Sequence, residues 1–186
     1  MAGSLDQLPD DLPIPIDDGA ANHLMGLRLP DITLPATDGS SVALGALKGV
    51  SVLYFYPRTG RPDQELPDNW NMIPGARGCT PQSCAFRDHF AELNALGVAH
   101  VFGISTQDTD YQREAATRLH LPFALLSDDR FVLAQALNLP MMSVGGMRLF
   151  RRLTLITRDG KIERIFYPVF PPDRNARDVL DTLRAL

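Results

Sequence analysis

The sequence predicts an α/β fold with a mixed central β-sheet that is flanked by helices on both faces. From residue 50 to residue 138, short apolar runs of strand length alternate with segments of helical periodicity. Such alternation is typical of parallel strands joined by crossover helices. Two later apolar runs flank the turn residues Asp159-Gly160 and predict an antiparallel hairpin. Parallel units followed by a hairpin make the expected sheet mixed.

The composition bounds the size and the class of the protein. The chain has 186 residues, of which 45% are apolar, enough for one domain with a single core. Its formal net charge is −4 and its basic residues do not cluster, which argues against a nucleic-acid partner. No apolar run approaches the roughly 18 residues of a membrane span, and the first residues lack the pattern of a signal peptide. We therefore expect a cytoplasmic protein with no membrane partner.

The chain begins with a segment that has no strand or helix period. Residues 1–25 mix prolines and acids, and we interpret them as an extended N-terminal arm on a domain that covers residues 26–186. Within the domain, residues 31–35 predict a short strand and residues 50–56 a buried one. The next stretch is rich in proline and glycine and has no period. We interpret about residues 60–78 as a loop insertion at the mouth of a site, before the helix that follows.

The second half of the chain predicts the remaining elements. A helix should have Thr80 as its N-cap and Pro81 as its first residue, with Phe86, Phe90 and Leu93 on its buried face. Expected after it are a strand at 98–105, a helix at 108–120, a strand at 123–127, a short helix at 131–138, hairpin strands at 153–157 and 162–167, and a closing helix capped by Asp173.

The only two cysteines, Cys79 and Cys84, lie five positions apart where the loop turns into the first of these helices. A thiol at a helix N-terminus lies among unpaired backbone N–H groups at the positive end of the helix dipole, which favours the nucleophilic thiolate. In a reducing compartment a close pair is more often catalytic, redox-sensing or metal-binding than a permanent crosslink. Simple packing in the core is the competing interpretation for each cysteine. Cys79 is the first candidate for chemistry.

A series of short motifs in a fixed order surrounds this pair. The motifs are Tyr54-Phe55-Tyr56-Pro57, Gly78-Cys79-Thr80, Phe86-Arg87-Asp88, Gly103-Ile104-Ser105-Thr106, Leu125-Leu126-Ser127-Asp128 and Asp159-Gly160-Lys161. Together they resemble the peroxiredoxins, most closely the bacterioferritin-comigratory or peroxiredoxin Q group, from residue 26 to the C-terminus. The resemblance implies a thioredoxin-like fold and a thiol-dependent peroxidase that reduces hydrogen peroxide or organic hydroperoxides without a cofactor.

The resemblance also implies roles for individual residues. Cys79 matches the peroxidatic cysteine and Cys84 the resolving cysteine of the group. Counting back nine residues from Gly160 places Arg151 where the family keeps an active-site arginine. Arg152 should then point to the opposite face of the strand, because side chains alternate along it.

One position departs from the family pattern. Ala76 stands three residues before Cys79, where the family has threonine or serine. Pro57 and Thr59 follow the buried strand in the usual place, so we expect the insertion to separate them from Cys79 in sequence and folding to bring them back. The Thr59 hydroxyl would then bind the peroxide together with Arg151, and Pro57 would shield the oxidised sulfur from water.

The implied chemistry sets a geometric problem. Attack on a peroxide leaves Cys79 as a sulfenic acid, which Cys84 would convert to a disulfide. Five residues of regular helix place two Cα atoms about 8.6 Å apart, beyond the roughly 7 Å that a disulfide can bridge. We therefore expect the first helical turn to unwind during resolution, and Pro81 eases this because it donates no backbone hydrogen bond.

Two other functions compete with the peroxidase. A thiol–disulfide oxidoreductase usually has two residues between its cysteines, whereas this pair has four. A copper-binding module of the Sco type needs a histidine near the cysteines. The reductant stays open between thioredoxin, glutaredoxin and glutathione, and the assembly between a monomer and a homodimer. Trp70 either pins the insertion onto the domain or lines a pocket for an organic part of the peroxide.

Overall fold

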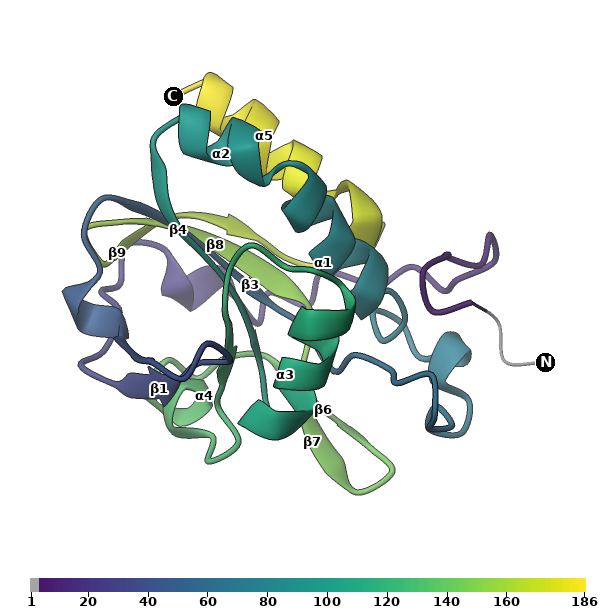
Figure 1. Ribbon diagram of the computed structural model, residues 1–186. Helices are drawn as coiled ribbons and strands as arrows, with labels where there is room; N and C mark the ends of the chain where they lie inside the picture. The colour runs from purple at the N-terminus through teal and green to yellow at the C-terminus, as the bar shows by residue number, and fades with distance from the viewer. Residues whose placement is uncertain (1–3) are drawn as a thin grey trace.

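A five-stranded mixed sheet forms the centre of the computed structural model, which describes residues 4–186 (Figure 1). The strands are β3 (Val50–Phe55), β4 (Val98–Ser105), β5 (Leu125–Ser127), β8 (Leu153–Arg158) and β9 (Lys161–Phe166). Their order is β5-β4-β3-β8-β9. β3 pairs in parallel with β4 and antiparallel with β8, so the sheet is mixed, as the sequence predicts.

Helices cover both faces of this sheet (Figure 1). They are α1 (Cys79–Asp88), α2 (Phe90–Ala95), α3 (Thr109–Arg118), α4 (Val132–Ala136) and α5 (Asn175–Arg184). Helices α1, α2, α3 and α5 pack on one face. On the other face lie α4 and the hairpin of β1 (Thr33–Pro35) and β2 (Ser41–Ala43). None of the helices between residues 4 and 186 is both long and apolar enough to cross a membrane.

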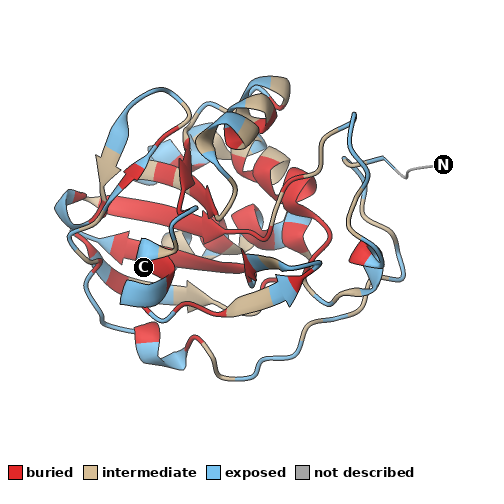
Figure 2. Cartoon of the chain, turned by 90° about the horizontal axis from the view of Figure 1, so that it is seen from below, coloured by how far each residue is buried: buried red, intermediate tan, exposed pale blue. Residues whose placement is uncertain are grey.

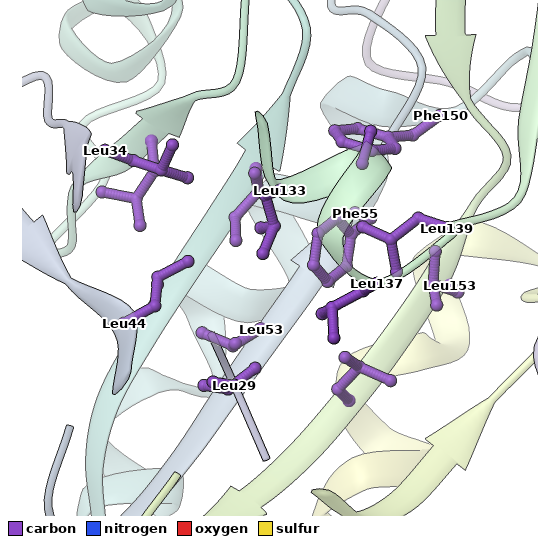
Figure 3. Packing of buried hydrophobic residues seen from close by; sticks show 14 of the residues in the cluster. Leu29, Leu34, Leu44, Leu53, Phe55, Leu133, Leu137, Leu139, Phe150 and Leu153 are labelled. Carbon is purple, nitrogen blue, oxygen red and sulfur yellow. The ribbon is translucent and has the colours of Figure 1, made fainter. Parts of the chain in front are cut away.

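Alternate residues of β3 contribute to two separate hydrophobic clusters. Leu53 and Phe55 pack toward α4, and Figure 3 shows Phe55 close to Leu137. Tyr54 points to the opposite face, where it belongs to the cluster that contains Cys79. Because both faces are covered, β3 is buried along its whole length, as the central strands in Figure 2 show. The expected pattern of a buried strand flanked by helices is confirmed.

The helix that carries both cysteines differs from the expectation at its start and its end. It begins two residues earlier than expected, at Cys79, because Gly78, with a φ of 111°, occupies the N-cap, and Thr80 lies inside the first turn. Phe90 and Leu93, expected on the same helix as Phe86, lie on a second helix, because the chain is broken at His89 into α1 and α2. Asp173 does not cap α5 but lies in the 3₁₀ turn before it. No side chain therefore competes for the N–H groups at the start of α1.

Sequence analysis misses one hairpin, made of β6 (Met141–Val144) and β7 (Met147–Phe150). Gly145 and Gly146 form its turn, with φ of 54° and 78°, values that suit a two-residue hairpin loop. The insertion packs against this hairpin, and the side chain of Trp70 in the insertion is buried there. Of the two expectations for Trp70, the structure shows the one in which this side chain pins the insertion onto the domain.

The N-terminal arm follows the surface of the domain. Residues 4–21 form neither a strand nor a helix, and residues 1–3 of the expected arm lie outside the described chain. Leu24, in a 3₁₀ turn, anchors the end of the arm in the cluster on the α4 side. Near the start of the arm, the carbonyls of Ser4 and Gln7 accept hydrogen bonds from Arg77 Nη2. The arm therefore passes beside the loop that leads into α1.

We predict that Gly78→Ala destabilises the protein more than Gly97→Ala does. Both glycines have a positive φ, 111° and 87°. A Cβ at Gly78 would overlap the side chain of Pro172 and crowd Leu8, whereas a Cβ at Gly97 would meet nothing within 4 Å. The strained φ alone should cost about 1 kcal/mol. The overlap should bring the cost of Gly78→Ala to about 3 kcal/mol.

Urea denaturation of the two variants and the parent protein measures the free energy of unfolding. Gly97→Ala serves as the matched control for backbone strain. Equal losses in the two variants would contradict the close packing of Pro172 on the start of α1.

Candidate active site

Cys79 is the first residue of α1 and is 3% exposed. Its thiol donates to the carbonyl of Ala76 at a distance of 3.7 Å. The first hydrogen bond of the helix runs from the Gln82 N–H to the Gly78 carbonyl, so the N–H groups before Gln82 have no helical acceptor. Together with the helix dipole, these groups place positive potential beside the sulfur.

Arg152, and not Arg151, is the arginine beside this sulfur. Its Nη2 lies 3.2 Å from Cys79 Sγ, and the side chain is 3% exposed. Arg151 is exposed, and its Nε donates to the backbone carbonyl of Met141 at 3.1 Å. The expectation that Arg151 completes the site is therefore wrong.

The error lies in the choice of sheet face. Thr154 pairs with Tyr54 of β3, and both side chains lie on the face that α1 and α5 cover. Because side chains alternate along a strand, Arg152 shares the face of Thr154 and Arg151 points the other way. Cys79 packs in the same cluster as Tyr54. Matching the face of Tyr54, rather than counting residues back from the hairpin turn, identifies Arg152.

A buried series of hydrogen bonds holds the Arg152 guanidinium. Its Nη1 donates to Gln82 Oε1, and Gln82 Nε2 donates to Asn175 Oδ1 at 3.0 Å. The Thr154 hydroxyl donates to the same Asn175 oxygen at 2.7 Å. All four side chains are buried, so removing one would leave its partner unpaired away from water. Sequence analysis misses Gln82, Thr154 and Asn175, because they come from three elements whose contacts are set only by the tertiary fold.

The guanidinium has no acidic partner among the residues that the structure describes. Its Nη2 also donates to the backbone carbonyls of Ala76 at 3.0 Å and Gly75 at 3.2 Å. None of the ion pairs within residues 4–186 includes Arg152. Its Nε is buried without a hydrogen-bond partner in that part of the chain. A buried cation with neutral partners and an unused N–H can hold both a thiolate and an oxygen of a bound molecule.

Cys84 lies five residues further along α1, half-buried and not bonded to Cys79. Burial raises the pKa of the Cys84 thiol above its ordinary value of 9.0, and the nearby Arg87 offsets part of this shift. At neutral pH Cys84 is therefore a thiol rather than a thiolate. The two cysteines of the pair thus have different environments, one beside a buried cation and one mainly affected by desolvation.

The structure does not bring the Thr59 hydroxyl to Cys79. Thr59 Oγ1 donates to Gln107 Oε1 at 3.3 Å, and the Thr59 carbonyl accepts from the Tyr111 hydroxyl at 3.0 Å. These bonds tie the loop after β3 to the region of α3, and no hydrogen bond among the described residues joins Thr59 to Cys79. We therefore correct the expectation that Thr59 replaces the threonine of the family pattern.

At the sequence position of that missing threonine, Ala76 contributes its backbone carbonyl to the site. Ala76 is fully buried, and its carbonyl accepts from both the Cys79 thiol and Arg152 Nη2. The methyl group of Ala76 packs in the same cluster as Trp70 of the insertion. Pro57 is buried directly after β3, and its shielding of the sulfur stays a prediction. The described residues include no group of three or more His, Cys, Asp or Glu side chains that could hold a metal ion.

Sequence comparison relates this geometry to known proteins. The redoxin family model matches residues 25–182. The chloroplastic peroxiredoxin Q of Oryza sativa subsp. japonica is 31% identical over 162 residues, which are 87% of this chain and 67% of that protein. The chloroplastic peroxiredoxin Q of Populus jackii is 30% identical over 162 residues, which are 87% of this chain and 68% of that one.

Solved structures agree with the fold. Peroxidoxin BcpB from Mycobacterium tuberculosis gives a TM-score of 0.69 at 28% identity, over 87% of this chain and 97% of that one. A cysteine-to-serine variant of PrxQ from Xylella fastidiosa gives a TM-score of 0.70 at 19% identity, over 87% and 95%, and supports the fold alone. The expected thioredoxin-like arrangement is confirmed. The chain therefore belongs to the redoxin family and, within it, to the thiol-dependent peroxidases of the peroxiredoxin Q type.

Proposed function

We propose that Cys79 is the peroxidatic cysteine of this peroxidase, that Arg152 binds the peroxide, and that Cys84 resolves the oxidised sulfur in an intramolecular disulfide. One observation carries the proposal, the 3.2 Å contact between Arg152 Nη2 and Cys79 Sγ at the N-terminus of α1. It brings together a nucleophile, a cation and the unused N–H groups of a helix start. A breaking O–O bond needs such donors, because negative charge develops on the departing oxygen.

In the first step the Cys79 thiolate attacks one oxygen of the peroxide. An S–O bond forms, the O–O bond breaks, and its electron pair leaves with the other oxygen, which takes a proton from solvent to become water or an alcohol. Arg152 can donate to the reacting oxygens through Nη2 and through its Nε, which has no partner among the described residues. Cys79 is left as a sulfenic acid.

In the second step the Cys84 sulfur attacks the sulfur of the Cys79 sulfenic acid. An S–S bond forms, and the hydroxyl group leaves as water with the proton of the Cys84 thiol. The regular helix between the two residues holds the sulfurs apart, so the first turn of α1 must open. The hydrogen bond from the Gln82 N–H to the Gly78 carbonyl is the first to break. Pro81 donates no backbone hydrogen bond that this opening would have to break.

A thiol reductant then returns the disulfide to two thiols. The sequence leaves three classes of reductant open, and the substrate is hydrogen peroxide or an organic hydroperoxide. The cytoplasmic location and the monomeric or homodimeric state stay predictions from the sequence. The plant relatives named above are chloroplastic proteins, so likeness to them does not support the cytoplasm in particular.

We predict that the two cysteine variants stop the reaction at different steps. With one equivalent of hydrogen peroxide, the parent protein should lose two thiols. Cys79→Ser should consume peroxide at least about a hundredfold more slowly, because the nucleophile is gone. Cys84→Ser should react at its remaining thiol and stop at the sulfenic acid, which dimedone traps. Thiol titration and mass spectrometry measure these outcomes, and a Cys79→Ser protein that reacts as fast as the parent would exclude the proposal.

We predict that Arg152→Gln and Arg151→Gln separate the two neighbouring arginines. Arg152→Gln should slow the oxidation of Cys79 about a hundredfold or more, because it removes the donors to the developing charge. Arg151→Gln should change the rate by less than about twofold, since this side chain is exposed and its one hydrogen bond to a described residue goes to the Met141 carbonyl, away from Cys79. Arg152→Lys, which keeps the charge but loses the planar fork, should fall between them. Stopped-flow measurement of peroxide consumption checks all three, and equal rates in the two glutamine variants would contradict the assignment.

We predict that Cys84 titrates above pH 9.0, its ordinary pKa. Burial disfavours the charged thiolate, so at any given pH less of the thiol should be ionised than in an exposed cysteine. In the Cys79→Ser variant, the rate of alkylation by iodoacetamide should therefore keep increasing beyond pH 9.0. The same variant in urea supplies the reference titration. A midpoint in the folded protein below that of the unfolded one would show that the arginines near Cys84, and not burial, dominate.

A further inference from the structure

A pocket of about 720 Å³ opens beside Cys84. Its walls come from the start of the N-terminal arm, the insertion after β3, α1, and the C-terminal end of α3. The charged residues that line it are Arg61, Arg87, Arg118 and Asp6. We call it the arginine pocket. Its volume falls in the range of pockets that hold small organic ligands.

Each of the three guanidinium groups forms an ion pair with a carboxylate, that of Asp63, Asp88 or Glu114, and keeps one terminal nitrogen unused by the hydrogen bonds of the described residues. Arg61 binds Asp63 through Nε and Nη2, which leaves Nη1. Arg87 uses Nε and Nη1, which leaves Nη2. Arg118 uses Nε and Nη2, which leaves Nη1. The bonds that are made fix the three side chains in place, and the remaining N–H groups are available to an anion.

We propose that the arginine pocket binds a small thiol that carries two carboxylates and one ammonium group, as glutathione does, and that this thiol reduces the disulfide by attacking Cys84. The inference deepens the proposed function and rests on it for the disulfide. Carboxylates suit the guanidinium N–H groups, and Asp6, the one acidic residue of the lining, suits an ammonium group. With Cys84 in the wall of the pocket, the thiol of such a ligand can reach the sulfur.

The placement of the two sulfurs decides which one is attacked. Cys79 is 3% exposed, whereas Cys84 is half-buried and borders the pocket. Opening of the first turn of α1 moves Cys79. It does not move Arg61 or Arg118, because Arg61 belongs to the insertion and Arg118 to α3. The pocket therefore keeps two of its arginines in the oxidised protein. A small thiol can enter the pocket between the arm and the insertion.

The exchange balances in two steps. The thiolate of the small ligand attacks Cys84 Sγ, a new S–S bond forms, the bond between Cys79 and Cys84 breaks, and its electron pair leaves with Cys79 as a thiolate. Arg152 receives this thiolate. A second small thiolate then attacks the sulfur of the bound ligand and releases Cys84 as a thiolate, which takes a proton from water. Two small thiols are oxidised to one disulfide, and one protein disulfide is reduced to two thiols.

The experiment starts from the oxidised protein, prepared with one equivalent of hydrogen peroxide. Rate constants for reduction by glutathione and by 2-mercaptoethanol are measured by thiol release and corrected for the ionised fraction of each thiol. We expect glutathione to react at least about tenfold faster than 2-mercaptoethanol, because only glutathione engages the arginines. Mass spectrometry of the quenched reaction should show one glutathionyl group on Cys84. The preference should weaken as salt is added.

Two substitutions in the pocket test the recognition. Arg118→Gln and Arg61→Gln should each lower the ratio of the two rate constants about fivefold to tenfold. Arg61 donates to the neighbouring Asp63, whereas Arg118 also donates to the backbone carbonyl of Gly60, so the Arg61 variant still tests the recognition if Arg118→Gln folds poorly. Arg158→Gln is the matched control, since Arg158 pairs with Glu163 at the end of β8 and does not line the pocket. Its ratio should equal that of the parent protein.

Equal rate constants for the two thiols would overturn the inference, and so would a glutathione preference that survives both substitutions. Rapid reduction by thioredoxin together with no preference for glutathione would assign the step to a protein reductant instead. Failure of peroxide to form the disulfide would count against the proposed function alone. The disulfide can then be made with diamide, and the comparison of the two thiols still decides the role of the arginine pocket.

Discussion

The contact between the buried guanidinium of Arg152 and the sulfur of Cys79 is the constraint on which the site depends. Removing a cation from water is costly unless other groups replace the lost hydration. Here carbonyl oxygens and the amide of Gln82 do so, and all of them are neutral. The thiolate of Cys79 is the one anion that the described contacts of Arg152 can supply. The fold that buries the arginine therefore also places the nucleophilic sulfur beside it.

Three separate elements make this contact possible. Arg152, the residue just before β8, lies on the face that α1 covers, and Gly78 lets the chain turn sharply into α1 so that the sulfur lies at the helix start. Asn175, the first residue of α5, orients Gln82 and thereby the guanidinium. Each element is also part of a hydrophobic layer, so the position of the reacting atoms follows from the packing of the whole domain. The site is built on helices and a strand, with the loop of Ala76 closing over it.

Local patterns in the sequence identify most of the fold and the two cysteines. The buried strand at β3, the alternation through α4 and the final hairpin all carry periodic signals, and the position of Cys79 at a helix start follows from nearby residues. The arginine could not be chosen this way, because a residue count says nothing about which sheet face α1 covers. The prediction for Thr59 failed for a related reason, since the hydrogen bond from its hydroxyl to Gln107 depends on contacts between distant segments. The same holds for Gln82 and its buried partners.

The two cysteines have to satisfy opposite requirements on one helix. The first step needs Cys79 held at the start of an intact α1, whereas resolution needs that turn to open. Oxidation changes the balance, because a sulfenic acid is neutral and no longer compensates the charge of Arg152. The interaction that keeps the first turn closed is thus strongest in the thiolate and weaker in the state that must open. The chemical step itself therefore weakens the constraint on the sulfur, and the helix start closes again when the thiolate returns.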